Sequence, residues 1–310
     1  MPTITITGGT GLIGQALTEA LLNKGYHVII VSRKLFQKSN RVNLSFATWN
    51  VEKQSVDREA ISKADYIIHL AGAGVADKRW TRKRKQEIIS SRVDSSRLIA
   101  NSLQTIPNKV KAVISSSATG WYGADAVLPA GKPFTENDPA DDSFLGNTCK
   151  LWEESISPVS GSGIRLVIFR TGIVLSKKGG ALKEFLKPLR FGIAAILGNG
   201  KQMISWIHID DLTGMYIKAI EDASLNGVYN ATSPHPVSNK ELIMALAKTR
   251  KFFYIPFHIP SFLLKWIFGK MSIEVLKSTT VSSQKIIDTG FSFQFPEIKQ
   301  ASRYFLSEKN

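Results

Sequence analysis

The chain has 310 residues, of which 43% are hydrophobic and 21% are charged. We therefore expect a folded protein with one large domain, or a large domain that carries a smaller one. The absence of low-complexity tracts and internal repeats excludes disordered and solenoid proteins, and the single cysteine, Cys149, excludes an intramolecular disulfide framework and a thiolate-rich metal site.

A protein with a single cysteine fits a reducing compartment, and we expect a cytoplasmic location. The N-terminus leads directly into a strand-like segment and lacks the pattern of a signal peptide. The longest apolar stretch, 252–268, contains Pro256, His258, Pro260 and Lys265. These residues leave it short of a membrane span. We interpret the stretch as a buried segment and leave peripheral membrane contact open.

The formal net charge is +15, and the densest basic run is Lys-Arg-Trp-Thr-Arg-Lys-Arg-Lys at residues 78–85. Such a charge attracts nucleic acids and anionic lipids. Consecutive basic residues, however, spread around a helix instead of lining one face, and no nucleic-acid-binding motif accompanies them. We therefore interpret the run as the solvated start of a helix and do not expect a nucleic acid partner.

Short β-branched segments alternate with helical patterns through the first two-thirds of the chain, which is typical of βαβ units. Apolar residues at helical spacing predict helices over 14–24 and 83–103, and a third after Asn147. Strands are predicted at 3–7, 27–32, 66–70, 112–116 and 166–170. We expect an α/β fold, a Rossmann-type doubly wound parallel sheet with a smaller C-terminal substrate-covering part.

A glycine-rich turn, Gly-Gly-Thr-Gly-Leu-Ile-Gly over residues 8–14, joins the first predicted strand to the first predicted helix. Gly8 suits the tight turn, Gly11 lets the backbone approach a pyrophosphate, and Gly14 allows close packing of helix and strand. The helix N-terminus adds N–H groups and a positive dipole end, so the turn predicts a dinucleotide site. Its expected contacts are Gly8, Thr10, Gly11, Leu12, Ile13 and Gly14.

The end of the second predicted strand distinguishes the two nicotinamide cofactors. An acidic residue there accepts hydrogen bonds from a ribose 2′-hydroxyl and repels a 2′-phosphate. This sequence has no acid at that point and reads Ser32, Arg33 and Lys34. Arg33 can pair with a phosphate bidentately, while Ser32 and Lys34 add a donor and a charge. These residues favour NADP(H) over NAD(H).

Small residues follow the predicted strand at 66–70. We expect Leu70, Ala71 and Gly72 to let the adenosine and ribose of the cofactor lie against the backbone.

Glycines punctuate the chain beyond residue 171, where the pattern loosens into helices and short strands. We predict an NADP-binding Rossmann domain over 1–220, from which residues 171–205 contribute to the substrate part, and a substrate-covering C-terminal domain over 221–310. Ligands of open α/β sheets bind at the carboxyl ends of the strands, so we expect the crevice between the two parts.

With these motifs the chain resembles the extended short-chain dehydrogenase/reductase superfamily, also called the NAD-dependent epimerase/dehydratase family. More narrowly, it is similar to an atypical branch with a C-terminal domain of unknown function. The superfamily landmarks are the turn at 8–14 and the segments 70–72, 115–119, 122–123, 170–172 and 206–212. The branch motifs are Arg-Trp-Thr at 79–81, Ser-Arg-Val at 91–93, Cys-Lys-Leu-Trp-Glu at 149–153 and Ser-Trp-Ile-His at 205–208. The landmarks imply Ser115 and Arg170 as further cofactor-site residues.

The resemblance does not extend to the catalytic pair. Active relatives carry Tyr-x-x-x-Lys at the start of the helix after the fifth strand, where the lysine lowers the tyrosine pKa. If Glu153 marks the register here, Leu145 and Cys149 replace the pair. If Lys150 is retained, Gly146 replaces the tyrosine. The usual proton donor is missing in either register.

Two residues near the fifth strand remain catalytic candidates. Ser117 matches the polar residue of the family's serine run and can orient a substrate oxygen, and Tyr122 can serve as the general acid if its hydroxyl faces the crevice. The alternative is that Tyr122 packs beneath its loop. We interpret Cys149 as a packing residue and His208 as a residue that orders its loop, while Trp80, Gln202 and Trp206 are candidates for lining the crevice.

These features lead to the hypothesis of an NADP(H)-dependent oxidoreductase or epimerase-like enzyme that acts on a small polar carbonyl or alcohol. The alternative is a non-catalytic NADP(H)-binding redox sensor or regulatory module, since the Tyr-x-x-x-Lys pair is missing. Association with nucleic acid or a cell envelope rests on charge alone. We expect a monomer or homodimer, no membrane span and no metal site.

Overall fold

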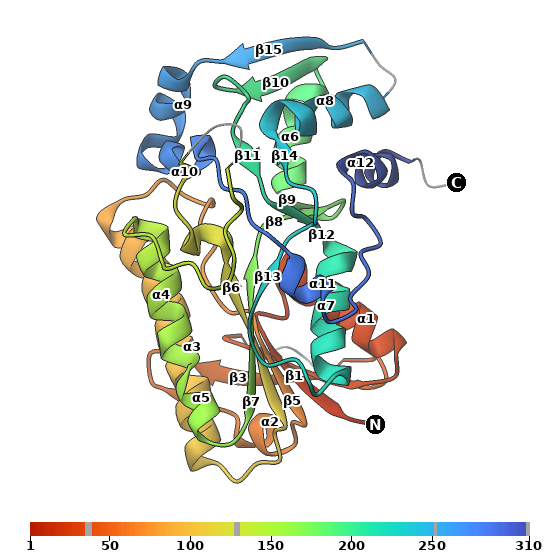
Figure 1. Ribbon diagram of the computed structural model, residues 1–310. Coiled ribbons are helices and arrows are strands. Elements are labelled where there is room, and N and C mark those ends of the chain that lie inside the picture. The colour runs from red at the N-terminus through yellow and green to blue at the C-terminus, as the bar shows by residue number, and fades with distance from the viewer. Residues whose placement is uncertain (35–38, 127–130, 251–252, 308–310) are drawn as a thin grey trace.

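The computed structural model describes residues 1–34, 39–126, 131–250 and 253–307. An eight-stranded sheet forms its centre (Figure 1). In spatial order the strands are β13 (Gly227–Ala231), β7 (Arg165–Thr171), β6 (Ala112–Ala118), β5 (Tyr66–His69), β1 (Thr3–Thr7), β2 (His27–Ser32), β3 (Leu44–Asn50) and β4 (Ser55–Val56). All neighbours pair in parallel except β3 and β4. The order is that of a doubly wound Rossmann sheet, as expected from the sequence.

Helices cover both faces of this sheet, so its central strands are mostly buried. Helices α1 (Leu12–Asn23) and α7 (Ile209–Glu221) lie on one face, and α3 (Arg82–Thr105) and α4 (Phe144–Ile156) lie on the other (Figure 1). The two short helices α2 (Arg58–Ser62) and α5 (Pro158–Gly161) lie at the end of the molecule opposite to the crevice.

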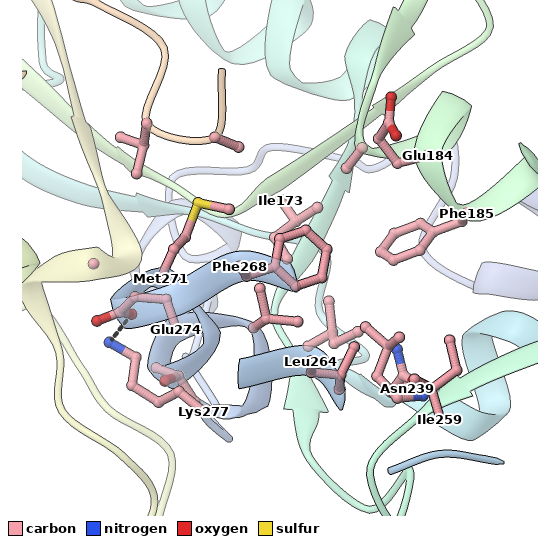
Figure 2. Close-up of a pocket in the computed structure, with 18 of the residues that line it drawn as sticks. Ile173, Glu184, Phe185, Asn239, Ile259, Leu264, Phe268, Met271, Glu274 and Lys277 are labelled. Carbon is pink, nitrogen blue, oxygen red and sulfur yellow. Dashed lines mark hydrogen bonds and ion pairs between the residues drawn. The ribbon is translucent and has the colours of Figure 1, made fainter. Parts of the chain in front are cut away.

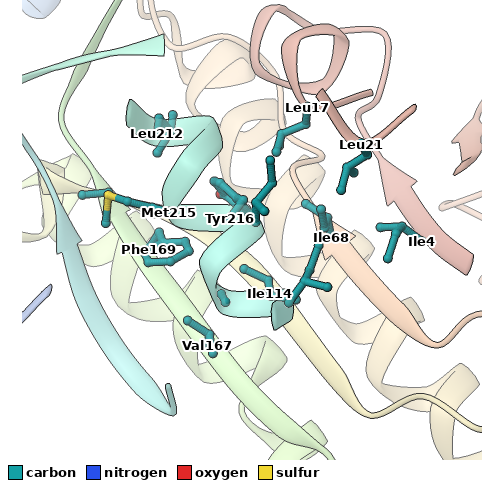
Figure 3. Packing of buried hydrophobic residues seen from close by; sticks show 14 of the residues in the cluster. Ile4, Leu17, Leu21, Ile68, Ile114, Val167, Phe169, Leu212, Met215 and Tyr216 are labelled. Carbon is teal, nitrogen blue, oxygen red and sulfur yellow. The ribbon is translucent and has the colours of Figure 1, made fainter. Parts of the chain in front are cut away.

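Figure 3 shows how the first pair of helices packs. Leu17 and Leu21, four residues apart on one face of α1, contact the strands near Ile4. Leu212 and Tyr216 of α7 enter the same apolar cluster, in which all five side chains are fully buried. Burial of each such side chain stabilises the fold by roughly 1.5–3 kcal/mol.

The predicted bounds agree with the structure at β1 and β2, and the other predicted strands differ by at most two residues at either end. Helix α4 begins at Phe144, where Ser143 caps it by accepting a hydrogen bond from the Gly146 N–H, and so starts before Asn147. Strand β3 was not predicted. It alternates buried and more exposed residues, as befits a strand near the edge of the sheet.

The C-terminal half of the chain builds a second group of elements. They are β8 (Ile173–Ser176), β9 (Gly179–Gly180), α6 (Ala181–Leu189), β10 (Ile193–Leu197), β11 (Met203–Ile204), β12 (Trp206–His208), β14 (Val237–Ser238), α8 (Asn239–Thr249), β15 (Ile255–Ile259), α9 (Ser261–Phe268), α10 (Ser272–Leu276), α11 (Gln284–Ile287) and α12 (Ile298–Leu306). Two 3-10 turns, η1 (Thr119–Trp121) and η2 (Gly269–Met271), complete the structure. A separate apolar cluster unites α6, β10, α8 and α12.

The domain boundary predicted after residue 220 lies too early in the chain, because β13 begins at Gly227 and still belongs to the large sheet. Residues 171–205 pack within the C-terminal group, where β8, α6 and β10 contribute to its apolar cluster. Among the described residues, no helix has both the length and the apolar composition needed to cross a membrane.

Two residues at the start of α7 connect the C-terminal segment to the sheet. The Asp211 carboxylate accepts hydrogen bonds from the N–H groups of Gln294 and Phe295 at 2.6 and 3.0 Å. His208 caps α7 by accepting from the Asp210 N–H, and its buried ring lies 3.9 Å from that of Phe295. Burial lowers the pKa of His208 to about 4. The neutral imidazole therefore orders this loop, in agreement with the sequence interpretation.

Close packing of α1 on β1 depends on Gly14. A Cβ at this position would lie 2.4 Å from the Gly8 carbonyl oxygen and 2.5 Å from the Gly9 Cα. Gly14→Ala is expected to destabilise the protein by about 1–3 kcal/mol, because backbone must move to admit the methyl group. Gly161→Ala is the matched control, since its Cβ would have no neighbour within 4 Å. Urea unfolding measures both, and equal stability of the two variants would contradict the packing argument.

Candidate functional site

The glycine turn has the backbone geometry that its sequence suggests. Gly8 has φ +72°, and a Cβ there would lie 2.9 Å from the carbonyl carbon of Leu70. The Gly11 N–H donates to the Gly8 carbonyl at 3.0 Å, and Gly11 then begins α1 with an extended backbone and no side-chain cap. The first-turn N–H groups of a helix have no partner within the helix. At α1 these belong to Leu12, Ile13 and Gly14, beside the exposed Thr10.

This turn lies at the point where the sheet reverses its order. From β1 the chain proceeds to β2 and β3 on one side, and then to β5, β6, β7 and β13 on the other. Ligands of open α/β sheets bind in the crevice at such a switch point. Leu70, Ala71 and Gly72 follow β5 there, directly beside Gly8.

Side chains of α3 hold the loop that follows β5. Ser91 accepts a hydrogen bond from the Ala73 N–H at 2.9 Å, and Arg92 donates to the Ala73 carbonyl at 3.0 Å. Arg84 donates to the Gly74 carbonyl. Burial lowers the pKa of Arg92, whose guanidinium lies 5.0 Å from the centre of the Trp152 ring. Ser91 and Arg92 of the Ser-Arg-Val motif therefore hold the backbone of this loop against α3.

Basic residues stand at the end of β2. Ser32 Oγ accepts from the Lys34 N–H at 3.2 Å, while Arg33 and Lys34 are exposed. The pKa of Glu87 on α3 is lowered, first by its hydrogen bond to Arg84 and further by the charges of Lys78 and Arg33. Part of the basic run at 78–85 therefore lies near Arg33. Arg84 of this run is buried, which corrects the expectation of a wholly solvated helix start.

A buried ion pair organises the ends of β6, β7 and β13. The Arg170 guanidinium binds both oxygens of Glu153 at 2.9 Å. Ser117 donates to Glu153 at 2.6 Å, and Arg170 also donates to the Tyr122 hydroxyl at 3.1 Å. Tyr122 in turn donates to Asn230 Oδ1 at 2.7 Å. These five residues form one hydrogen-bonded network, which we call the arginine network.

The arginine network alters the roles expected for its members. Tyr122 is 0% exposed and stacks on Phe134 at 5.3 Å, and burial raises its pKa to about 12. These contacts argue against Tyr122 as proton donor and favour the packing alternative. Arg170 is 3% exposed with its donors occupied, and Ser115 is buried and donates to the Ser116 carbonyl. Both side chains therefore have partners within the protein, and their contact with a cofactor stays a prediction.

The structure describes the residues of both alternative registers of α4. A Cβ at Gly146 would lie 2.0 Å from the Asp141 carbonyl oxygen, so that position admits no tyrosine. Leu145 and Cys149 both face Gly120 of the turn after β6. In the register marked by Glu153 these two residues replace the Tyr-x-x-x-Lys pair, and Lys150, which the other register retains, is exposed. Burial raises the Cys149 pKa to about 12, in keeping with a packing role.

A cavity of about 640 Å³ lies between the large sheet and the C-terminal elements (Figure 2). One wall consists of residues after β5 and β6, including Trp80 and Leu145, and the other of α6, α9 and α10. Its lining is mainly apolar: Val75, Ile173, Phe185, Leu264, Phe268 and Met271 are examples. Trp80 lines this cavity, as predicted from the sequence.

Gln202 and Trp206 do not line this cavity, contrary to expectation. Gln202 is buried and donates to the Leu197 carbonyl, while Trp206 lies in the C-terminal apolar cluster and donates to the His235 carbonyl.

One ion pair lies in the apolar wall. Lys277 Nζ is 2.7 Å from the Glu274 carboxylate, and both side chains line the cavity and are mostly buried (Figure 2). Lys277 also donates to the Tyr122 carbonyl at 3.1 Å, which links the cavity to the loop of the arginine network. The sequence analysis missed this pair. Two opposite charges three residues apart in an apolar C-terminal segment were its only signal.

Substitution of Glu153 tests how much the arginine network contributes to the free energy of unfolding. Glu153→Ala is expected to destabilise the protein by about 3–5 kcal/mol, because it leaves the buried Arg170 cation without its partner. The matched control is Glu154→Ala on the exposed side of α4, with a change within about 0.5 kcal/mol. Chemical denaturation compares the two, and a loss for Glu153→Ala as small as that of the control would refute the assignment.

Comparisons with known proteins agree with this architecture. The NAD dependent epimerase/dehydratase family model matches residues 4–232, and a domain of unknown function, DUF1731, matches residues 259–304. Epimerase family protein YfhF of Bacillus subtilis is 34% identical, with 99% of this chain and 98% of that protein covered.

Solved structures show the same likeness. The crystal structure of human epimerase family protein SDR39U1 with NADPH is 28% identical with a TM-score of 0.86, covering 98% of this chain and 99% of that chain. A nucleoside-diphosphate sugar epimerase from Corynebacterium glutamicum is 29% identical with a TM-score of 0.77, covering 98% of this chain and 58% of that one. The chain belongs to the NAD dependent epimerase/dehydratase family.

Proposed function

We propose that this protein is an NADP(H)-dependent oxidoreductase, or an epimerase-like enzyme, whose substrate occupies the apolar cavity. The observation that carries the proposal is the position of the cavity. It is bounded by residues that follow β5 and β6, and Leu70 at the end of β5 lies beside Gly8 of the glycine turn at the switch point of the sheet. A reactant in the cavity would therefore lie beside a dinucleotide bound along that turn.

The residues around the turn fit a phosphorylated dinucleotide. The open N-terminus of α1 offers N–H groups for a pyrophosphate. The backbone is packed so closely at positions 8 and 14 that only glycine fits there. Arg33 and Lys34 would hold the 2′-phosphate, and 70–72 would support the adenosine side. When bound, NADP(H) supplies or accepts a hydride. NADPH in the SDR39U1 crystal structure supports this assignment.

The cavity changes the substrate class that we expected. The sequence suggested a small polar carbonyl or alcohol, whereas most of the lining is apolar and the volume is about 640 Å³. A polar sugar would lose its hydration there without enough hydrogen-bond partners. We infer an amphipathic carbonyl or alcohol substrate, with an apolar body against α9 and its oxygen near Lys277.

Lys277 is our candidate for the proton donor. Leu145 in the cavity wall has no ionisable group, and the Tyr122 hydroxyl is turned into the arginine network. Lys277 Nζ reaches the cavity wall, where Glu274 fixes its position at 2.7 Å. The ammonium group would donate its proton to the substrate oxygen and recover it from solvent after release.

A non-catalytic NADP(H)-binding module is the second candidate. It is favoured by the apolar Leu145 and the buried Cys149 at the positions of the Tyr-x-x-x-Lys pair. Such a module would bind nucleotide tightly and use the cavity for a ligand that it does not convert.

NADPH should bind more tightly than NADH, because Arg33 and Lys34 replace the acid that would recognise a 2′-hydroxyl. Arg33→Asp should erase or reverse this preference by removing a charge-assisted pair worth about 1.5–3 kcal/mol. Arg58→Asp on α2, far from the turn, is the control. Fluorescence titration with both nucleotides is the measurement. Equal affinities in the unmodified protein would overturn the NADP(H) assignment.

Oxidation of NADPH should be detectable with long-chain aldehydes, ketones or quinones and weaker with their short-chain homologues. Lys277→Met should lower kcat about 100-fold or more and leave NADPH affinity nearly unchanged, since general acid catalysis contributes ~10²–10⁴. Lys277→Arg, which keeps the charge and the Glu274 pair, is the control for folding. Tight NADPH binding without turnover of any substrate would favour the module instead.

A further inference from the structure

We propose that the end of the molecule formed by β15, α9 and α10 is a docking surface for anionic lipid membranes. The surface consists of the exposed residues Ile255, Phe257, Phe262, Trp266 and Ile273, flanked by lysines. We call it the apolar end. It lies at the top of Figure 1, opposite to α2 and α5.

The apolar end exposes an unusual set of side chains. Phe262 and Trp266, one helical turn apart on α9, are 73% and 76% exposed. Ile255 and Phe257 point out from alternate positions of β15, and Ile273 is exposed on the adjacent α10. Single exposed apolar residues are normal, but a group of large ones marks an interaction surface. Tryptophan and phenylalanine are the residues that helices insert at membrane interfaces.

The charge around the apolar end is positive. Lys265 and Lys270 are exposed within it. Arg79 donates a hydrogen bond to the Trp266 carbonyl at 3.1 Å, which brings the basic run at 78–85 alongside α9. Clusters of lysine and arginine beside an apolar helix face are attracted to anionic headgroups.

Nearby acids cancel only part of this charge. Asp77 and Glu87 pair with the buried Arg84, Glu184 pairs with Lys187, and Glu274 pairs with Lys277. Basic side chains such as Lys83 and Lys270 therefore remain to meet an anionic surface. A second copy of this chain would place the same basic residues against one another, which disfavours a symmetric dimer through this end.

Helix α9 connects the docking surface to the cavity. Its inner residues Leu264 and Phe268 line the cavity, while Phe262 and Trp266 face away from it. Ile267 lies at the boundary, because it lines the cavity and is also largely exposed. Docking of the apolar end would bring the cavity wall to the lipid, where an amphipathic molecule can pass between them.

Vesicle sedimentation tests the docking surface. The full chain should bind vesicles of phosphatidylcholine mixed with phosphatidylglycerol, bind those of phosphatidylcholine alone more weakly, and lose affinity as salt rises. The double variant Phe262→Ser/Trp266→Ser should reduce partitioning by about tenfold or more. Lys83→Gln and Lys270→Gln should each lower it by roughly fivefold on the anionic vesicles only.

Matched controls come from the opposite end of the molecule. Val42→Ser removes an exposed apolar residue just before β3, and Arg58→Gln removes an exposed charge at α2. Both should leave partitioning unchanged, with circular dichroism confirming the fold of every variant. Sedimentation that is equal for all variants would overturn the proposal. So would dimerisation that is lost in the Phe262→Ser/Trp266→Ser variant while vesicles remain unbound. Neither result would bear on nucleotide binding or turnover.

Discussion

The bidentate pair of Arg170 and Glu153 is the interaction on which the centre of this structure depends. It joins β7 to α4, and through Tyr122 and Asn230 it reaches the loop after β6 and strand β13. A buried cation is tolerated only when its partners satisfy it fully. Glu153, Tyr122 and the face of Trp121, 3.6 Å away, surround the guanidinium. The carboxyl ends of three strands are thus held in one arrangement, and the cavity wall is built on them.

The helix beside this network lacks the catalytic pair of the family pattern. In the family pattern a tyrosine on the helix after the fifth strand faces the reacting group, whereas here Leu145 of α4 adds an apolar side chain to the cavity wall. The polar groups of the strand ends are directed inward to Arg170 instead. We propose Lys277, whose side chain lines the cavity beside Glu274, as the proton donor in their place.

The local parts of the fold could be predicted from sequence because local rules specify them. Strand β1 alternates threonine with isoleucine and β2 has a central apolar run, both typical of strands, and the glycine turn has a known backbone requirement at Gly8. The roles of Arg170 and Tyr122 could not be predicted in this way. Their partners Glu153 and Asn230 are distant in sequence, and a motif names a residue without showing which way its side chain points. Strand β3 was missed because its partly exposed alternation differs from the central strands.

The apolar stretch near the C-terminus illustrates the same limit. Its composition indicated a buried segment, and for Leu264, which is 1% exposed, this is correct. Yet a short amphipathic helix over a cavity has two apolar sides, one that faces the cavity and one that does not. Periodicity cannot distinguish a second buried side from an exposed one, since both require apolar residues. Only the packing of α9 against the cavity, and the absence of any described segment over Trp266, separates the lining of a site from a surface for a partner.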